Sequence, residues 1–193
     1  MLKMMKISHY KSAEIHGHKL SRQGGAVAVE FAIIAMLLFT LLFGIIEFGR
    51  LFYVLNAAQE VTRHAARVAV VNWVDYSNTS PAKSAALFGG TSLPMGAEIS
   101  ADNINIEYLT ASGDTPNPFP SSAADNISAC LTGPDGCIAL VRVSIIGAQG
   151  ASCTAPDTDK ACYTPMVKLL TYLNTPIPAS TVTMPAESLG YAG

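Results

Sequence analysis

The pattern of hydrophobic and polar positions divides the chain into three parts. Residues 1–25 are polar and basic, with an uneven pattern that favours no regular element. Residues 26–46 follow as AVAVEFAIIAMLLFTLLFGII, an apolar run in which Glu30 is the one charged residue. A helix of this length spans a hydrocarbon core of about 30 Å. We therefore predict a membrane-spanning helix over residues 26–46.

A secretory signal peptide is the alternative interpretation of this run. The apolar region of a signal peptide usually has about 7–15 residues and ends at a small-residue cleavage site. Here the run is longer, and it continues without a turn signal into a second helical pattern. A retained membrane helix is therefore the prediction.

Residues 47–74 carry that second pattern, in which apolar residues recur at spacings of three and four. Such spacing places them on one stripe of a helix. No proline occurs before Pro81, so we predict one helix over 26–74, about 70 Å long. Its second part carries an apolar stripe that needs a partner, formed by Leu51, Val54, Leu55, Ala58, Val61, Thr62, Ala65, Val68 and Ala69.

Residues 75–193 predict a small ectodomain. Proline and glycine residues between 77 and 100 and between 112 and 120 indicate loops. Alternating apolar and β-branched residues predict strands. The predicted elements are strands over 101–110, 137–146 and 181–184 and a short helix over 166–173. The fold class is therefore α+β: a long N-terminal helix followed by a small antiparallel sheet.

Four cysteines lie in the last third of the chain. An even number in a chain with a membrane anchor suggests disulfides and an oxidising compartment. Zinc sites usually contain a CxxC knuckle, which is lacking here. We predict the local pairs Cys130–Cys137 and Cys153–Cys162, because the segments between them favour turns. The rival pairing joins Cys130 to Cys162 and Cys137 to Cys153.

Charge and motifs argue against nucleic-acid binding and against enzymatic activity. The formal net charge of the chain is −2. Residues 1–25 carry a net charge of +4, so residues 26–193 carry a net charge of −6. An acidic ectodomain lacks the basic patch that nucleic acid requires. The sequence contains no glycine-rich phosphate loop, HExxH or GxSxG motif. We expect no catalytic residue, no cofactor and no metal.

The most informative stretch is RQGGAVAVEF, residues 22–31. It places a basic residue and a glycine pair directly before the apolar helix, and Glu30 follows Gly25 by five residues. Gly25 offers a protease a flexible peptide bond without a side chain. Lysine and arginine hold residues 1–25 on the cytoplasmic side of a membrane. A carboxylate inside a membrane helix costs up to about 2.5–3.5 kcal/mol and usually has a partner.

Cleavage between Gly25 and Ala26 would create a partner for this carboxylate. Ala26 would become a new N-terminus with an ammonium group, and Glu30 would be the fifth residue of the mature chain. In a filament, the Glu30 carboxylate of one subunit would neutralise the ammonium of a neighbour. Because the glycine is doubled, cleavage after Gly24 is the alternative. A further alternative is that Glu30 simply reaches the headgroups and water.

Glycine, four residues, glutamate, an aromatic residue (Phe31) and a long apolar helix resemble the processing site of class III or IV prepilins. Residues 22–71 resemble the N-terminal region of TadE-like pilus assembly proteins. The features that carry this resemblance are AVEFAII, GIIEFGRLF and TRHAARVA. The ectodomain over 75–193 resembles no family, which is usual for the variable ectodomains of TadE-like proteins.

The resemblance implies a minor pilin or pseudopilin that is cut by a prepilin peptidase and supports assembly of an adhesive Flp-type pilus. It implies as partners other pilins or pseudopilins, the assembly platform and membrane lipid. It also implies a single-pass protein of the bacterial inner membrane, with a cytoplasmic N-terminus and a C-terminal domain in the periplasm or in the pilus. The alternative is an uncleaved membrane anchor that presents a disulfide-bonded binding domain.

Overall fold

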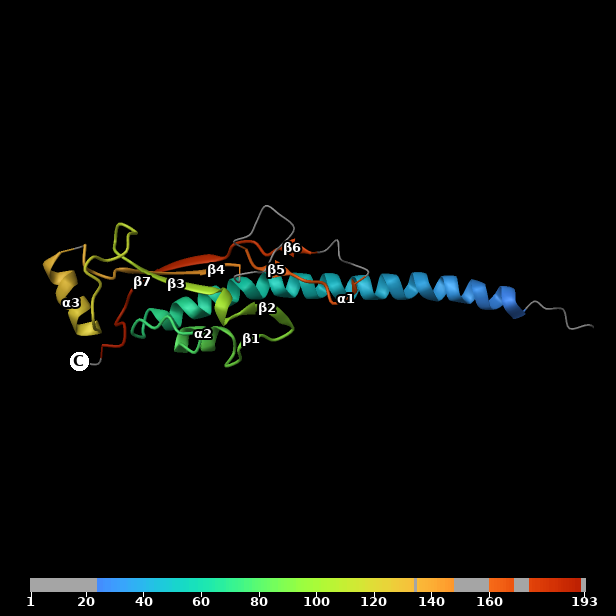
Figure 1. Cartoon of the computed structure of the whole chain (residues 1–193), viewed down its shortest axis with the longest axis horizontal. Helices are drawn as coiled ribbons and strands as arrows, with labels where there is room; N and C mark the ends of the chain where they lie inside the picture. Colours follow the sequence, from blue (N-terminus) through green and yellow to red (C-terminus); the bar gives the residue numbers. More distant parts are fainter. Residues whose placement is uncertain (1–23, 134, 148–159, 169–173, 192–193) are drawn as a thin grey trace, which may run out of the picture. The chain divides into compact units, whose positions relative to one another are not determined.

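The computed structural model describes residues 24–133, 135–147, 160–168 and 174–191. They form two compact units, Met1–Thr40 and Leu41–Gly193. The predicted long helix is present as α1, Gly24–Ala69, a helix of 46 residues. Figure 1 draws α1 as one uninterrupted helix. The predicted fold class is confirmed: α1 is followed by small antiparallel sheets.

The largest sheet has three antiparallel strands in the order β3–β4–β7. The strands are β3 (Ile104–Leu109), β4 (Leu140–Ile145) and β7 (Thr181–Pro185). Each contains part of a strand that alternation predicts. In β4, Val141, Val143 and Ile145 are buried while the residues between them are half-buried. Figure 1 shows the three strands side by side, with β4 in the centre.

The apolar stripe of α1 finds its partner in the ectodomain of the same chain. Val54, Ala58, Val61 and Ala65 are at most 2% exposed and belong to one hydrophobic core. The core also contains inward side chains of the sheet and of the loops around it, among them Ile99, Ile104, Val141, Val143, Tyr163, Ile177 and Leu189. Full burial of one valine, leucine or isoleucine side chain stabilises a fold by about 1.5–3 kcal/mol. The second part of α1 is therefore the central core element of the ectodomain.

The prediction of a loop over residues 77–100 is wrong. The segment contains α2 (Pro81–Ala86), β1 (Ser92–Leu93) and most of β2 (Gly96–Ser100), and β1 pairs with β2. Pro81 starts a helix because its fixed φ suits the first turn, where the missing N–H has no helical partner. The Ser80 hydroxyl caps this helix by accepting a bond from the Lys83 N–H at 3.2 Å.

Further elements differ from the predicted ones. A 3₁₀ turn, η1 (Ala101–Asn103), precedes β3, so this strand begins later than predicted. Helix α3 (Ala123–Thr132) is capped by the Ser122 hydroxyl, and β5 (Cys162–Tyr163) pairs with β6 (Thr175–Pro176). The helix predicted over 166–173 falls largely on residues 169–173, which lie outside the described residues.

Candidate functional site

The first turns of α1 hold the residues that the sequence marks for processing and assembly. Because the helix begins at Gly24, the residues Gly25, Ala26, Glu30 and Phe31 all lie on it. Phe31 is 72% exposed, and Glu30 is also exposed. A Cβ atom added at Gly25 would meet no atom within 4 Å. Among the described residues, therefore, nothing packs against the Gly25–Ala26 peptide bond from the side a Cβ would occupy.

Ala26 and Glu30 lie one helical turn apart on the same face of α1. Residues four apart on a helix are neighbours, and a carboxylate near a helix N-terminus is favourable. An ammonium group on Ala26 would therefore lie within reach of Glu30 of its own chain. The predicted pairing between subunits would therefore compete with this pairing inside one chain.

The next five turns of α1 carry large apolar side chains on every side. From Val27 to Ile46 these side chains are 45–72% exposed. A helix that is apolar all round is normally buried in a protein core or in a membrane. None of the most apolar stretch is buried within this chain, and the helix is long and apolar enough to cross a membrane. This geometry is consistent with a membrane anchor.

Comparison with known proteins identifies a family for the N-terminal part of the chain. Residues 25–67 match the family model described as TadE-like protein. This region of the chain is TadE-like. The match covers α1 almost from end to end and supports a TadE-like pilus assembly protein. No curated protein and no solved structure matches the chain.

A buried ionic network lies inside the TadE-like region, directly after the apolar run. Glu47 is only 2% exposed. Its carboxylate accepts hydrogen bonds from the Tyr163 hydroxyl at 2.5 Å and from the Met166 N–H at 3.1 Å. The Tyr163 hydroxyl also lies 3.2 Å from the Glu47 carbonyl oxygen. These contacts join α1 to β5 across 116 residues of sequence.

Arg50 completes this network one turn further along α1. Its guanidinium forms an ion pair with Glu98 at 2.8 Å and lies 3.6 Å from the Glu47 carboxylate. It also donates to the carbonyl oxygens of Met95 at 3.1 Å and Thr164 at 2.5 Å. The guanidinium carbon lies 4.6 Å from the centre of the Tyr163 ring, a cation–π distance. Arg50 therefore ties β2 and the segment after β5 to one point of the helix.

Burial and the bond to Glu47 raise the pKa of Tyr163 to about 12. Burial disfavours the charged phenolate, and the nearby carboxylate disfavours it further. Tyr163 therefore remains a hydrogen-bond donor to Glu47 well above neutral pH.

Sequence reasoning missed this network. In the sequence, the segment EFGR is informative only through the family resemblance, which names no partner for its two charges. A local signal was present, because a Glu–x–x–Arg pair directly after an apolar run places opposite charges one turn apart. The long-range partners Glu98, Tyr163 and Met166 carry no comparable signal in the sequence.

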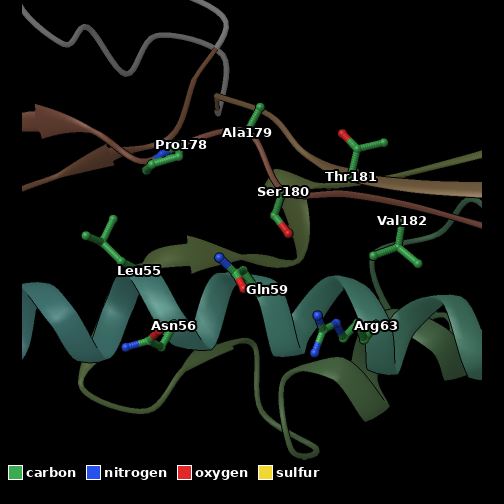
Figure 2. A pocket seen from close by; sticks show the side chains of 9 residues that line it. All are labelled: Leu55, Asn56, Gln59, Arg63, Pro178, Ala179, Ser180, Thr181 and Val182. Atoms are coloured by element: carbon green, nitrogen blue, oxygen red, sulfur yellow. The ribbon is translucent and has the colours of Figure 1, made fainter.

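A second surface is an open groove of about 410 Å³ between the TadE-like helix and the segment that leads into β7. The helix contributes Leu55, Asn56, Gln59 and Arg63, and the segment contributes residues 178–182. Figure 2 shows the Gln59 and Ser180 side chains facing each other across it. Beside the groove, the Thr62 and Ser180 hydroxyls lie 2.8 Å apart and join its two walls. The lining is mixed: apolar side chains such as Leu55 and Val182 lie beside amide, hydroxyl and guanidinium groups that can form hydrogen bonds.

The cysteines complete the sequence-marked residues. Cys130, near the end of α3, is joined to Cys137 in a disulfide, with 4.7 Å between their Cα atoms. This is one of the two local pairs that the sequence predicts. Cys162 in β5 is also disulfide-bonded. Its predicted partner, Cys153, lies outside the described residues.

The candidate residues that the sequence predicts lie in two separate units of the chain. The processing and assembly residues lie in Met1–Thr40, and the disulfides belong to Leu41–Gly193. Among the described residues, no group of three or more histidine, cysteine or acidic side chains is arranged to hold a metal ion.

Proposed function

We propose that this chain is a minor pilin or pseudopilin-like protein that supports assembly of an adhesive, tight-adherence (Flp-type) pilus. It is cut by a prepilin peptidase between Gly25 and Ala26 and anchored in the bacterial inner membrane, with its ectodomain in the periplasm or in the pilus. Its partners are other pilins or pseudopilins and the assembly platform. Its role is mechanical, so it has no catalytic residue.

The family match over residues 25–67 is the observation that carries this proposal. It begins at Gly25 itself, one residue before the apolar run starts. Glu30 supports the assembly role, because it is an exposed acid surrounded by exposed apolar side chains such as Phe31 and Ile34. An intramembrane acid without a protein partner is costly, so it marks a functional contact.

Terminal sequencing of the membrane-bound protein tests the cleavage. In cells with a prepilin peptidase we expect a chain that begins at Ala26, and in cells without it a chain that retains residues 1–25. Gly25→Val should leave the precursor uncut. Gly44→Val is the matched control, because Gly44 also has open space around its Cα and lies on the same helix.

Three outcomes separate the alternatives. A chain that begins at Gly25 places the cut after Gly24. Normal processing of Gly25→Val would argue against the proposed cleavage site. An intact segment 1–25 in peptidase-competent cells would favour the uncleaved anchor that presents a disulfide-bonded binding domain.

A further inference from the structure

Two loop segments of the ectodomain, the two tips, contact α1 at the point where its apolar run ends. The first is the turn between β1 and β2, where Arg50 binds the Met95 carbonyl oxygen at 3.1 Å. The second is the segment after β5, where Glu47 accepts the Met166 N–H at 3.1 Å. Both contacts lie within the unit Leu41–Gly193. The level of the two tips along α1 is therefore fixed by hydrogen bonds.

The side chains at these tips face away from the protein. Met95 is 76% exposed and Met166 is 77% exposed. Met95 also has a φ of 58°, in the left-handed region where glycine or asparagine is usual. A bulky apolar residue at this position has a local conformational cost and gains little packing within the chain. A contact outside the chain would compensate for it.

Helix geometry places these tips against a bilayer. The apolar run of 21 residues matches a hydrocarbon core of about 30 Å, and each headgroup layer adds roughly 5–8 Å. Glu47 follows the run directly, and Arg50 lies about 6 Å beyond Ile46 along the axis. Both charges and both tips therefore fall within the headgroup layer when α1 crosses the membrane.

The same level of α1 carries exposed aromatic side chains. Phe48 is 43% exposed, Phe52 is 61% exposed, and Tyr53 donates its hydroxyl proton to the Pro94 carbonyl oxygen at 3.0 Å. Aromatic rings concentrate at membrane–water interfaces because they combine an apolar body with a polar edge. Aromatic side chains thus follow the apolar run along α1, and one of them, Tyr53, contacts the β1–β2 turn.

We infer that Met95 and Met166 form a membrane collar, two loop tips that insert into the boundary between headgroups and acyl chains around the point where α1 leaves the bilayer. The occupant of this surface is lipid. The inference rests on the membrane anchoring of α1 in the proposed function. Glu47 and Arg50 position the collar, because they fix the backbone of both tips to the helix.

Depth-dependent fluorescence quenching tests the collar on the full chain in lipid nanodiscs. Trp73, the single tryptophan, is replaced by phenylalanine, and one tryptophan is introduced at a time as Met95→Trp, Met166→Trp, Met36→Trp or Leu131→Trp. Met36 lies in the middle of the apolar run, and Leu131 is 84% exposed on α3. Figure 1 shows α3 at the opposite end of the ectodomain from β5 and β6. Lipids brominated at shallow or at deep acyl positions serve as quenchers.

We expect tryptophan at 95 and at 166 to show blue-shifted emission and a loss of intensity with shallow bromines. Met36→Trp should lose intensity with deep bromines, and Leu131→Trp should lose none. Quenching of Met36→Trp without any at 95 or 166 overturns the collar and leaves the anchor intact. Absence of quenching at 36 removes the anchor and the collar together. Unchanged thermal unfolding of the variants excludes misfolding as a cause.

Discussion

The two halves of α1 have the same backbone and opposite surroundings. From Val27 to Ile46 the large apolar side chains are exposed on all sides, and from Leu51 to Val70 one stripe is buried against the ectodomain. The buried stripe is built largely from alanine and valine, for example Ala58, Val61 and Ala65. Small side chains let a sheet approach the helix closely, whereas the exposed half uses bulky leucine, isoleucine and phenylalanine. In this chain, side-chain size thus distinguishes the half of α1 that packs against the ectodomain from the half that is exposed.

Substitution of one valine in each half of α1 is the strongest test of this difference in surroundings. Val61 is 2% exposed, so Val61→Asp should destabilise the ectodomain by several kcal/mol, because a buried carboxylate without a partner is costly. Val29 is 59% exposed, so Val29→Asp should leave unfolding in detergent unchanged. Thermal unfolding of both variants in the same detergent measures the difference.

Val29→Asp should instead weaken the insertion of α1 into the membrane. An added acid in the apolar run opposes insertion by up to about 2.5–3.5 kcal/mol. We therefore expect less of this variant in the membrane fraction, while Val61→Asp still inserts. Equal loss of folding by both variants would show that the two halves do not differ in their surroundings.

Removal of Arg50 should have the next largest effect. Arg50→Met leaves two carboxylates, Glu47 and Glu98, without the cation that they share. This loss should lower the free energy of unfolding by about 3 kcal/mol. Arg63 is exposed on the same helix, so Arg63→Met is the matched control and should change stability by less than about 0.5 kcal/mol. Denaturant unfolding of the full chain in mild detergent gives both values. Similar values for the two variants would contradict the network.

Tyr163→Phe should cost about 2 kcal/mol at neutral pH, because the Glu47 carboxylate loses a hydrogen-bond donor. The pKa of Tyr163 is raised from 10 to about 12, so its contribution to stability is fully present below pH 10. That contribution is lost as the pH rises toward 12, because the unfolded state then favours the phenolate. The stability gap between wild type and variant should therefore narrow between pH 10 and pH 12. A gap that is constant over this range would contradict the bond.

Glu30→Ala should have the smallest effect on folding and a specific effect on assembly. The residue is exposed, so unfolding of the ectodomain should not change. Insertion should be at least as efficient, because a charge leaves the apolar run. Recruitment to other pilins, measured by co-purification from membranes, should be lost, whereas Glu60→Ala on the second half should retain it. Normal piliation with Glu30→Ala would argue against ammonium pairing.

The sequence predicts the elements whose pattern is local. An unbroken run of apolar residues followed by spacings of three and four predicts α1, and alternation around Arg142 and Ser144 predicts β4. The pattern does not predict the helix after Ser80, because Pro81 and the glycines that follow it indicate a loop, although serine before proline is a favourable helix start. The pattern does not predict helix α3 either, because the helix is short and lies between segments rich in proline and glycine.

The buried network escaped prediction for a different reason. Glu47 and Tyr163 are 116 residues apart, and Arg50 and Glu98 are 48 apart. Nothing in the local pattern around Tyr163 indicates that its hydroxyl meets a carboxylate on α1. A charge beside an apolar run can predict that a partner is needed, but only the folded chain shows which residue meets it.

The central position of β4 has a consequence for the order of events while the chain is being made. One neighbour, β3, precedes β4 in the chain, but the other, β7, begins only at Thr181. The N–H groups of Glu187 and Leu189 then bond to the Val70 carbonyl at the end of α1. Contacts between such distant residues form slowly. Until the segment around Leu189 has been synthesised, the alanine–valine stripe lacks part of its cover. A newly synthesised chain is therefore vulnerable to proteolysis and misassociation in that interval.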